Sequence, residues 1–256
     1  MAIKKFLNQN TSTDCKLYLP FDGADGATST SDLSPENHSI TFEGDAQLDT
    51  AEKKFGTASL LLDGTEDYIT SPDSDDWEIG DSNTNNKTIS MWINVSNSCY
   101  ILSQYNSDNS KWRINHSTTY GIKFALQTGG AIPMVAIQDT ANPLDDGEWH
   151  HIALIKVANI YSLYVDGDQR AYQNQSNTGS VGSSLLYLGQ SAAGSAYVNG
   201  WIDDLAFFDS NIFNAVPVVG LTDTITVPTS PFSVALIGKV STTNLANIAK
   251  IIGITK

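Results

Sequence analysis

The sequence predicts an all-β fold, built as a sandwich of two antiparallel sheets. Hydrophobic residues make up 41% and charged residues 16% of the 256 positions, a composition that supplies a core of this size. Short runs of β-branched and aromatic residues recur about every 8 to 15 residues, separated by Gly, Asn, Asp and Ser clusters. Helical periodicity is hard to find, so alternating strand-helix units are not favoured.

The expected strands follow in order from Lys16–Leu19, which ends at Pro20 and the Asp22-Gly23 turn. Thr88–Val95 alternates most clearly, with its apolar odd-numbered positions on one face. The others are Ser59–Leu62, Tyr68–Ile69, Ile101–Tyr105, Trp112–Asn115, Ile122–Leu126, Trp149–Val157, Ile160–Val165, a short strand near Tyr172, Leu185–Leu188 and Trp201–Phe208. We expect about 13 to 15 strands in all, which suits two broad sheets packed face to face.

Charge is distributed unevenly along the chain. The net charge is −14, and residues 1–81 hold 17 acids against 5 lysines, a net −12. Residues 224–256 contain three lysines and no acid. A nucleic-acid-binding protein needs a cationic footprint, so nucleic acid is not an expected partner, and an anionic membrane surface is disfavoured for the same reason.

Signals for a compartment are few. The N-terminus lacks the apolar run of a signal peptide, and no window approaches the length of a transmembrane helix, so we expect neither secretion nor membrane insertion. Cys15 and Cys99 lie far apart in sequence. They are expected to be two buried thiols that act as small hydrophobes, with a disulfide as the alternative.

Six segments, taken in order, resemble the laminin G-like family. They are Leu19–Gly23, Phe55–Leu60 running into Asp63-Gly64, Thr88–Ile93, Asp146–Ala153, Leu163–Gly167 and Gly200–Leu205. The resemblance covers about residues 14–210 and implies the concanavalin A-like jelly roll that laminin G modules share with pentraxins, legume lectins and several glucanases. The predicted organisation is an N-terminal arm (1–13), a jelly-roll domain (14–210) and a short C-terminal extension (211–256).

Enzyme activity is not expected. The glucanases of this superfamily carry a Glu-x-Asp-x-Glu arrangement on one strand, and retaining hydrolysis needs two carboxyl groups about 5 Å apart. That motif is missing here, and the acids at Asp145, Asp146 and Glu148 fall in a predicted turn. The sequence also lacks a Gly-x-Ser-x-Gly nucleophile elbow and a phosphate-binding loop.

A structural Ca²⁺ ion is implied by the resemblance. The family often binds calcium where the loop after the first strand meets the last strand, and the matching positions here are Asp22 with Asp203 or Asp204. Calcium takes about six to eight oxygen ligands, and a carboxylate in an apolar strand is costly unless it is paired or bound to metal. The alternative is that Asp203 or Asp204 caps backbone amides.

Glycan binding is the commonest use of this family. A sugar site needs exposed aromatic rings for stacking and amides for the hydroxyl groups. Tyr105, Trp112 and Tyr120 lie among asparagines, and Trp77 lies in a long acidic loop over residues 70–87. These four residues are the predicted glycan-binding aromatics, and the alternative for each is a place in the core.

The C-terminal extension carries a short repeat. Ile237-Gly238-Lys239-Val240 and Ile248-Ala249-Lys250-Ile251 recur at a period of 11. These motifs resemble the Ile-x-Lys repeats that trail virion proteins of tailed phages, many of which also carry laminin G-like domains. We expect Ile237, Lys239, Val240, Ile248, Lys250 and Ile251 to dock on a partner or a symmetry mate, unless the tail is disordered or packs locally.

The function predicted from these observations is a structural or adhesive role, without catalysis, on a phage virion. The chain would be part of the tail, a fibre or a capsid decoration, with other virion proteins and copies of itself as partners. A host-surface glycan is a further expected ligand. The alternative is a secreted or cell-surface carbohydrate-binding module, which would place the protein outside the cell.

Overall fold

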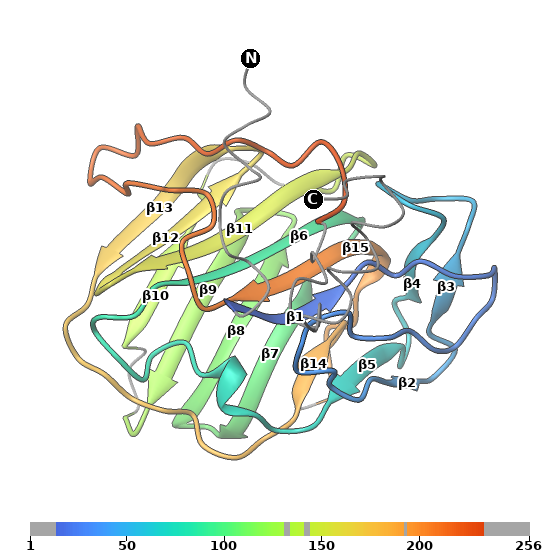
Figure 1. Ribbon diagram of the computed structural model, residues 1–256, viewed down its shortest axis with the longest axis horizontal. Helices are drawn as coiled ribbons and strands as arrows, with labels where there is room; N and C mark the ends of the chain where they lie inside the picture. Colours follow the sequence, from blue (N-terminus) through green and yellow to red (C-terminus); the bar gives the residue numbers. More distant parts are fainter. Residues whose placement is uncertain (1–13, 131–133, 141–143, 192–193, 233–256) are drawn as a thin grey trace, which may run out of the picture.

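The computed structural model describes residues 14–130, 134–140, 144–191 and 194–232, which form a sandwich of two antiparallel sheets (Figure 1). The eight-stranded sheet has the order β13-β12-β11-β6-β15-β4-β3, with β1 also paired to β15. The seven-stranded sheet has the order β10-β9-β8-β7-β14-β5-β2. The predicted all-β fold class and its two-sheet antiparallel architecture are confirmed.

The strand bounds are as follows. The eight-stranded sheet contains β1 (Cys15–Leu19), β3 (Gln47–Asp49), β4 (Ser59–Asp63), β6 (Lys87–Val95), β11 (His150–Val157), β12 (Ile160–Val165), β13 (Asp168–Asn174) and β15 (Asn199–Phe208). The seven-stranded sheet contains β2 (Thr41–Glu43), β5 (Tyr68–Ser71), β7 (Cys99–Ser107), β8 (Ser110–Ser117), β9 (Gly121–Thr128), β10 (Val135–Gln138) and β14 (Leu186–Leu188). A single 3₁₀ turn, η1 (Asp75–Trp77), lies in the acidic loop.

Each strand expected from the sequence is present. Three further strands, β2, β3 and β10, had no counterpart among the expected strands, and each has only three or four residues. Strands of that length are too short to show an alternating pattern. All three lie at sheet edges or next to them, where burial of side chains is least complete.

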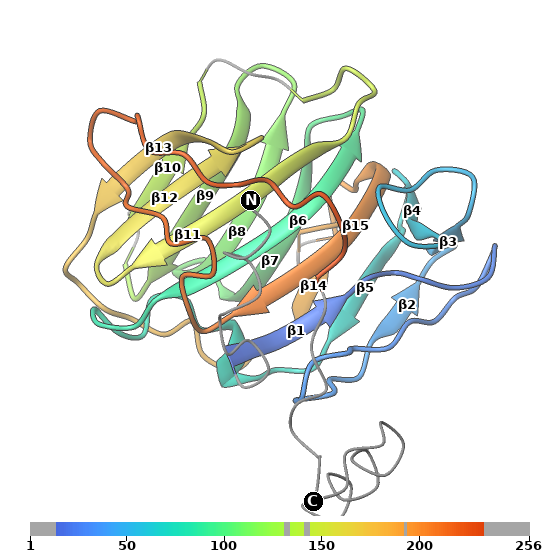
Figure 2. The same ribbon diagram turned by 45° about the horizontal axis from the view of Figure 1, so that its top comes forward.

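The core forms between the two sheets, and β6 is buried on both of its faces. Ile89, Met91, Ile93 and Val95 face the interior as the alternation predicted, yet all nine residues of β6 are buried. The second face is covered in part by Lys54 and Phe55, which contact the Trp92 ring. It is also covered by the chain after β15, residues 209–232, which crosses the outside of the eight-stranded sheet (Figure 2) and whose Ser210 carbonyl accepts from the Thr88 hydroxyl. We call these residues the strap.

The strap is bound to the sheet along its length. Ala215 and Ile225 pack against Ala153, Ile155 and Tyr164. Near its end, Phe232 makes an edge contact with the ring of Tyr18, 6.2 Å between centroids. The domain therefore extends to residue 232 at least, rather than ending at residue 210 as the sequence indicated.

The searched part of the chain, which leaves out the undescribed residues, contains no helix long and apolar enough to cross a membrane. Cys15 and Cys99 are both buried free thiols, and burial raises the pKa of each to about 12. The expectation of two thiols acting as buried hydrophobes is confirmed.

Candidate functional site

A break in the pairing of β15 positions two aspartates predicted to bind metal. The first half of β15 pairs with β4, from Asn199 to Ile202, and the second half pairs with β1, where Leu205 lies opposite Leu19. Asp204 lies in the irregularity between these halves with a positive φ of 51°. Asp203 and Asp204 are therefore held where β1 and β4 meet the same strand.

Asp203 is a cap for backbone amides. One carboxylate oxygen accepts hydrogen bonds from the amides of Lys54 (2.8 Å) and Phe55 (2.9 Å), and the other accepts from the amide of Asp204 (2.8 Å). The side chain is fully buried, and desolvation raises its pKa to about 7 despite these donors. This arrangement matches the amide-capping alternative for this residue.

Asp204 is less well satisfied than its neighbour. Its Oδ1 accepts from the Tyr18 hydroxyl at 2.9 Å and from the Phe232 amide at 3.4 Å. Its Oδ2 is buried and has no hydrogen-bond partner among the described residues. Burial, with the nearby charge of Asp22 as a smaller cause, raises the pKa of Asp204 to about 6.

Asp22 lies on the exposed side of the same corner. Its Oδ1 accepts from the Thr57 hydroxyl at 3.0 Å, and it approaches Asp204 closely enough to raise that pKa. Within the described ranges, no group of three or more His, Cys, Asp or Glu is arranged to hold a metal ion. Asp22 and the unpartnered oxygen of Asp204 could supply some of the oxygen ligands of a calcium ion, whereas both oxygens of Asp203 already accept hydrogen bonds from backbone amides. The calcium site stays a prediction.

Two of the four predicted glycan-binding aromatics are core residues. Trp77 and Trp112 are both 0% exposed. The Trp112 indole donates to Gln104 Oε1 (2.9 Å) and to the Trp77 carbonyl (3.0 Å), inside the sandwich. A buried ring has no face for a sugar, so the prediction that Trp77 and Trp112 form a stacking platform is wrong.

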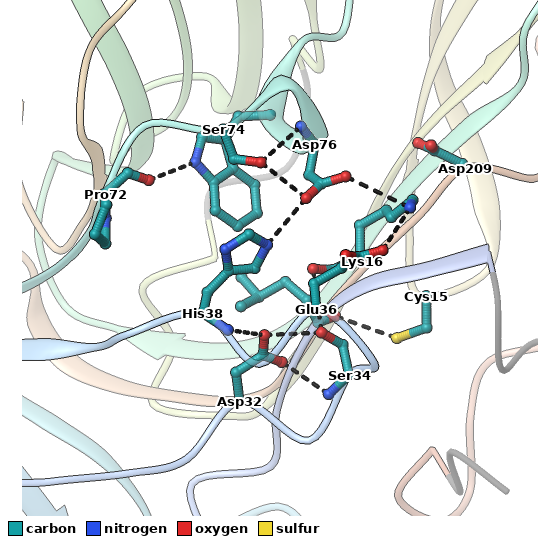
Figure 3. A network of polar contacts seen from close by, with 12 residues as sticks. Cys15, Lys16, Asp32, Ser34, Glu36, His38, Pro72, Ser74, Asp76 and Asp209 are labelled. Atoms are coloured by element: carbon teal, nitrogen blue, oxygen red, sulfur yellow. Dashed lines mark hydrogen bonds and ion pairs between the residues drawn. The ribbon is translucent and has the colours of Figure 1, made fainter. Parts of the chain in front are cut away.

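Polar contacts explain why Trp77 is buried although its loop is acidic. Asp76 accepts hydrogen bonds from His38 at 3.0 Å and from Ser74 at 2.8 Å, and the Lys16 ammonium lies 3.6 Å from the same carboxylate (Figure 3). The His38 ring lies 4.6 Å from the ring of Trp77. The loop is thereby tied to the first strand and closes over the end of the core.

The other end of this loop is held by Glu78. This buried carboxylate accepts from the Ser180 hydroxyl (2.7 Å) and from the amides of Val181 (3.0 Å) and Gly182 (3.1 Å). The acidic loop is therefore a fixed part of the sandwich in the described structure.

Tyr105 belongs to a pocket on the solvent face of the seven-stranded sheet. The pocket lies over β7 and β8 and the segment after β14, and most of its lining residues are polar, although its exposed surface is more apolar than polar. It is lined by Tyr100, Ser103, Gln104, Tyr105, Asp108, Lys111, Trp112, Arg113, Ser191 and Ser195. Tyr120, which is 50% exposed in the turn between β8 and β9, is not among these residues.

Two cation–aromatic contacts organise the pocket. The Arg113 guanidinium lies 5.5 Å from the ring centroid of Tyr100, and the Lys111 ammonium lies 5.3 Å from that of Tyr105. Asp108 accepts from the Tyr105 hydroxyl at 3.0 Å and lies 3.5 Å from Lys111. The pocket thus combines two tyrosine rings, two cations and one acid.

Tyr100, Lys111 and Arg113 were not among the predicted site residues. The sequence does contain one indication of the two cations: the stretch between Asp81 and Asp139 has four basic residues and a single acid, Asp108. What the sequence does not show is that cross-strand pairing places Ser103 opposite Arg113 and Tyr105 opposite Lys111.

The acids near Trp149 form no catalytic arrangement with each other. The His150 ring is held between Asp166 (2.7 Å) and Asp146 (3.1 Å), and these bonds raise its pKa. His151 points to the other face, as expected for adjacent residues of a strand, and contacts Ser90 at 2.9 Å. Trp149 is half-buried rather than a core residue, and its indole donates to Glu52 at 2.6 Å.

A family model matches this chain. A laminin G model, described as the concanavalin A-like lectin/glucanases superfamily, matches residues 63–214, which is more than half of the chain. The chain belongs to this superfamily. The expected resemblance is confirmed at this level.

Solved structures support the same fold at low identity. The binding domain of botulinum neurotoxin serotype G is 18% identical with a TM-score of 0.60, over 78% of this chain and 49% of its own. The binding domain of Paraclostridial Mosquitocidal Protein 1 is 15% identical with a TM-score of 0.60, over 78% of this chain and 50% of its own. The present chain spans about half the length of these structures.

A third similar structure concerns botulinum neurotoxin type C, whose cell entry is described as dependent upon interaction with two ganglioside molecules. It is 17% identical with a TM-score of 0.57, over 79% of this chain and 49% of its own. No curated protein sequence matches the chain.

The predicted docking residues from Ile237 to Ile251 lie outside the described residues.

Proposed function

We propose that this protein is an adhesive glycan-binding domain that catalyses no reaction. The observation that carries the proposal is the pocket over β7 and β8, where Tyr100 and Tyr105 flank polar and charged groups on an open sheet face. Aromatic faces and convergent polar groups are the features by which proteins hold sugars in place. Membership of a superfamily that includes lectins supports this proposal.

The absence of catalysis is proposed from the chemistry of the same pocket. Glycoside hydrolysis by the common mechanisms needs two carboxyl groups on either side of the scissile bond. Asp108 is the single acid among the residues that line the pocket. The similar solved structures named above are described as binding domains or by their interaction with ganglioside molecules, which agrees with a binding role.

The proposal also includes a place on a phage particle. This part depends on the Ile-x-Lys repeats between Ile237 and Ile251, together with the laminin G-like domain before them. Mass spectrometry of purified particles tests it directly. Detection of the chain at a fixed copy number supports a virion role, whereas its recovery only from the medium favours a secreted carbohydrate-binding module.

A glycan array with the full chain tests the binding role. We expect specific binding that Tyr100→Ala and Tyr105→Ala each reduce at least tenfold. Tyr172→Ala is the matched control, because this half-buried tyrosine lies on β13 of the other sheet. If no glycan binds, or if the control reduces binding as much as the pocket variants do, the proposal is wrong.

A further inference from the structure

The seven-stranded sheet presents a cationic face in a strongly acidic protein. Of 28 acids in the chain, only Asp108 falls between residues 82 and 138, the stretch that includes β7, β8 and β9. Lys111, Arg113 and Lys123 come from β8 and β9 within this stretch. Their cross-strand partners are neutral: Tyr105, Ser103 and Asn115, respectively. The charge is therefore not used to hold the strands together.

Of the two cations that line the pocket, Lys111 pairs with Asp108, whereas Arg113 has no carboxylate from the described ranges within ion-pair distance. Outside the pocket, Lys16, Lys87 and Arg170 also form ion pairs. The Nε of Arg113 is buried and has no hydrogen-bond partner among the described residues; the same holds for the Nε of Arg170, but Arg170 pairs with Asp168 through its Nη2. A buried donor without an acceptor is costly, and such groups in native proteins usually have a partner or a function.

The guanidinium is also held in place. It lies 5.5 Å from the ring centroid of Tyr100, within the range of a favourable cation–π contact, and the side chain is half-buried. A planar fork of donors fixed in this way matches the geometry of a carboxylate and can form two parallel hydrogen bonds to it.

We propose that Arg113 is the anchor for the carboxylate of an acidic sugar that binds in the pocket over β7 and β8. This inference rests on the proposed function and adds the class of ligand. The rings of Tyr100 and Tyr105 flank the sugar, and the hydroxyls of Ser191 and Ser195 face its hydroxyl groups from the rim of the pocket.

Asp108 sets the strength of this interaction. Its carboxylate lies 3.5 Å from the Lys111 ammonium and accepts from the Tyr105 hydroxyl, so it neutralises the second cation of the pocket. Asp108→Asn removes a negative charge from the rim and releases Lys111. It should therefore strengthen the binding of an acidic sugar and leave the binding of a neutral sugar nearly unchanged.

Titration calorimetry with the full chain tests the inference, using sialyllactose and lactose as an acidic and a neutral probe that share one core. Lactose bearing a sulfate is the third probe. We expect sialyllactose to bind at least tenfold more tightly than lactose. Arg113→Gln should remove most of this difference, Arg113→Lys should keep part of it, and Asp108→Asn should increase it.

Arg170→Gln is the control of matched charge, since Arg170 lies on β13 in the other sheet and pairs with Asp168. It should leave all affinities unchanged, and thermal melting should show that each variant is folded. Equal losses for Arg113→Gln and Arg170→Gln would mean that only the overall charge matters, which overturns the inference.

Two further outcomes separate this inference from the proposed function. If lactose binds as tightly as sialyllactose and Arg113→Gln changes neither affinity, the acidic-sugar anchor is wrong while glycan binding stands. The same holds if only the sulfated probe binds, because the ligand would then carry no carboxylate. If no sugar binds here or on the array, both proposals fail together.

Discussion

Asp203 and Asp204 are neighbours in β15, yet the carboxylate of Asp203 is fully hydrogen-bonded while one oxygen of Asp204 has no partner among the described residues. The difference arises from the positive φ of Asp204, which breaks the alternation of the strand. Burial raises both pKa values, and a nearby carboxylate adds to each effect: Asp204 for Asp203, and Asp22 for Asp204. We therefore expect the stability of this corner of the sandwich to depend on pH.

The first prediction concerns Asp204→Asn without calcium. A carboxyl whose pKa is raised from 3.8 to about 6 in the folded protein favours folding below pH 3.8 and loses that contribution as the pH rises through 6. The amide removes this cost while it can still accept from Tyr18. At pH 8 we expect the variant to be more stable than wild type by roughly 2 kcal/mol, or roughly 4–8 °C in Tm.

The comparison is made by thermal melting at pH 4 and pH 8 with a chelator present. The advantage of Asp204→Asn should shrink toward pH 4, where the wild-type carboxyl is protonated. Asp75→Asn is the control, since Asp75 is exposed and lies in η1. A difference in Tm that is the same at both pH values would contradict the assignment.

The second prediction concerns calcium itself. An ion bound between Asp22 and the free oxygen of Asp204 would stabilise the folded state by mass action, about 2.7 kcal/mol when calcium exceeds its Kd a hundredfold. EDTA should then lower the wild-type Tm by several degrees. Asp22→Asn and Asp204→Asn should each abolish the shift, and an unchanged wild-type Tm rules out a structural site here.

The third prediction uses the adjacent histidines, whose titrations act in opposite directions. Burial lowers the pKa of His151 to about 3, so its neutral form contributes stability above pH 6.5 that is lost as the pH falls. The hydrogen bond to Asp166 raises the pKa of His150, so its contribution is present below pH 6.5 and is lost as the pH rises through the raised value.

Urea unfolding from pH 4.5 to 8 measures both effects. His151→Gln should lose less stability than wild type on acidification. In wild type, His151 takes up a proton in the unfolded chain but not in the folded protein, and glutamine takes up none in either state. His150→Gln should show the opposite trend: its free energy of unfolding should fall further below that of wild type as the pH decreases. Parallel curves for the two variants would refute the assignment of the two environments.

The alternation of apolar residues predicted the strands well, because the apolar side chains that face the core recur with a period of two along strands such as β6. The same pattern said little about Trp77 and Trp112. Trp112 lies between a lysine and an arginine, and Trp77 lies among acids, so local polarity suggested exposure. Their burial depends on contacts with distant residues, such as the bond from Trp112 to Gln104 and the ring of His38 over Trp77.

The pocket could not be assembled from the sequence for a related reason. Tyr100 and Arg113 come from different strands, and only the register of β7 against β8 brings their side chains together. The register is irregular between Tyr100 and Leu102, so counting along the strands would not have found the pair. Aspartates 22, 203 and 204 were found by resemblance, yet their separate roles appear only from their hydrogen bonds.

The last prediction concerns the strap, whose removal should cost far more than the loss of the residues after it. A chain that ends after residue 232 keeps the packing of Ala215 and Ile225 on the sheet, whereas one that ends at residue 210 exposes Ile155 and Tyr164. We expect the first to melt close to wild type and the second to be strongly destabilised or insoluble. The single substitution Tyr164→Phe, which removes the 2.7 Å bond to Asp223, should cost about 1 to 2 kcal/mol in urea unfolding. Equal melting of the two truncated chains would show that the strap is dispensable, whereas loss of particle incorporation in the longer one, with its stability intact, would assign docking to residues 233–256.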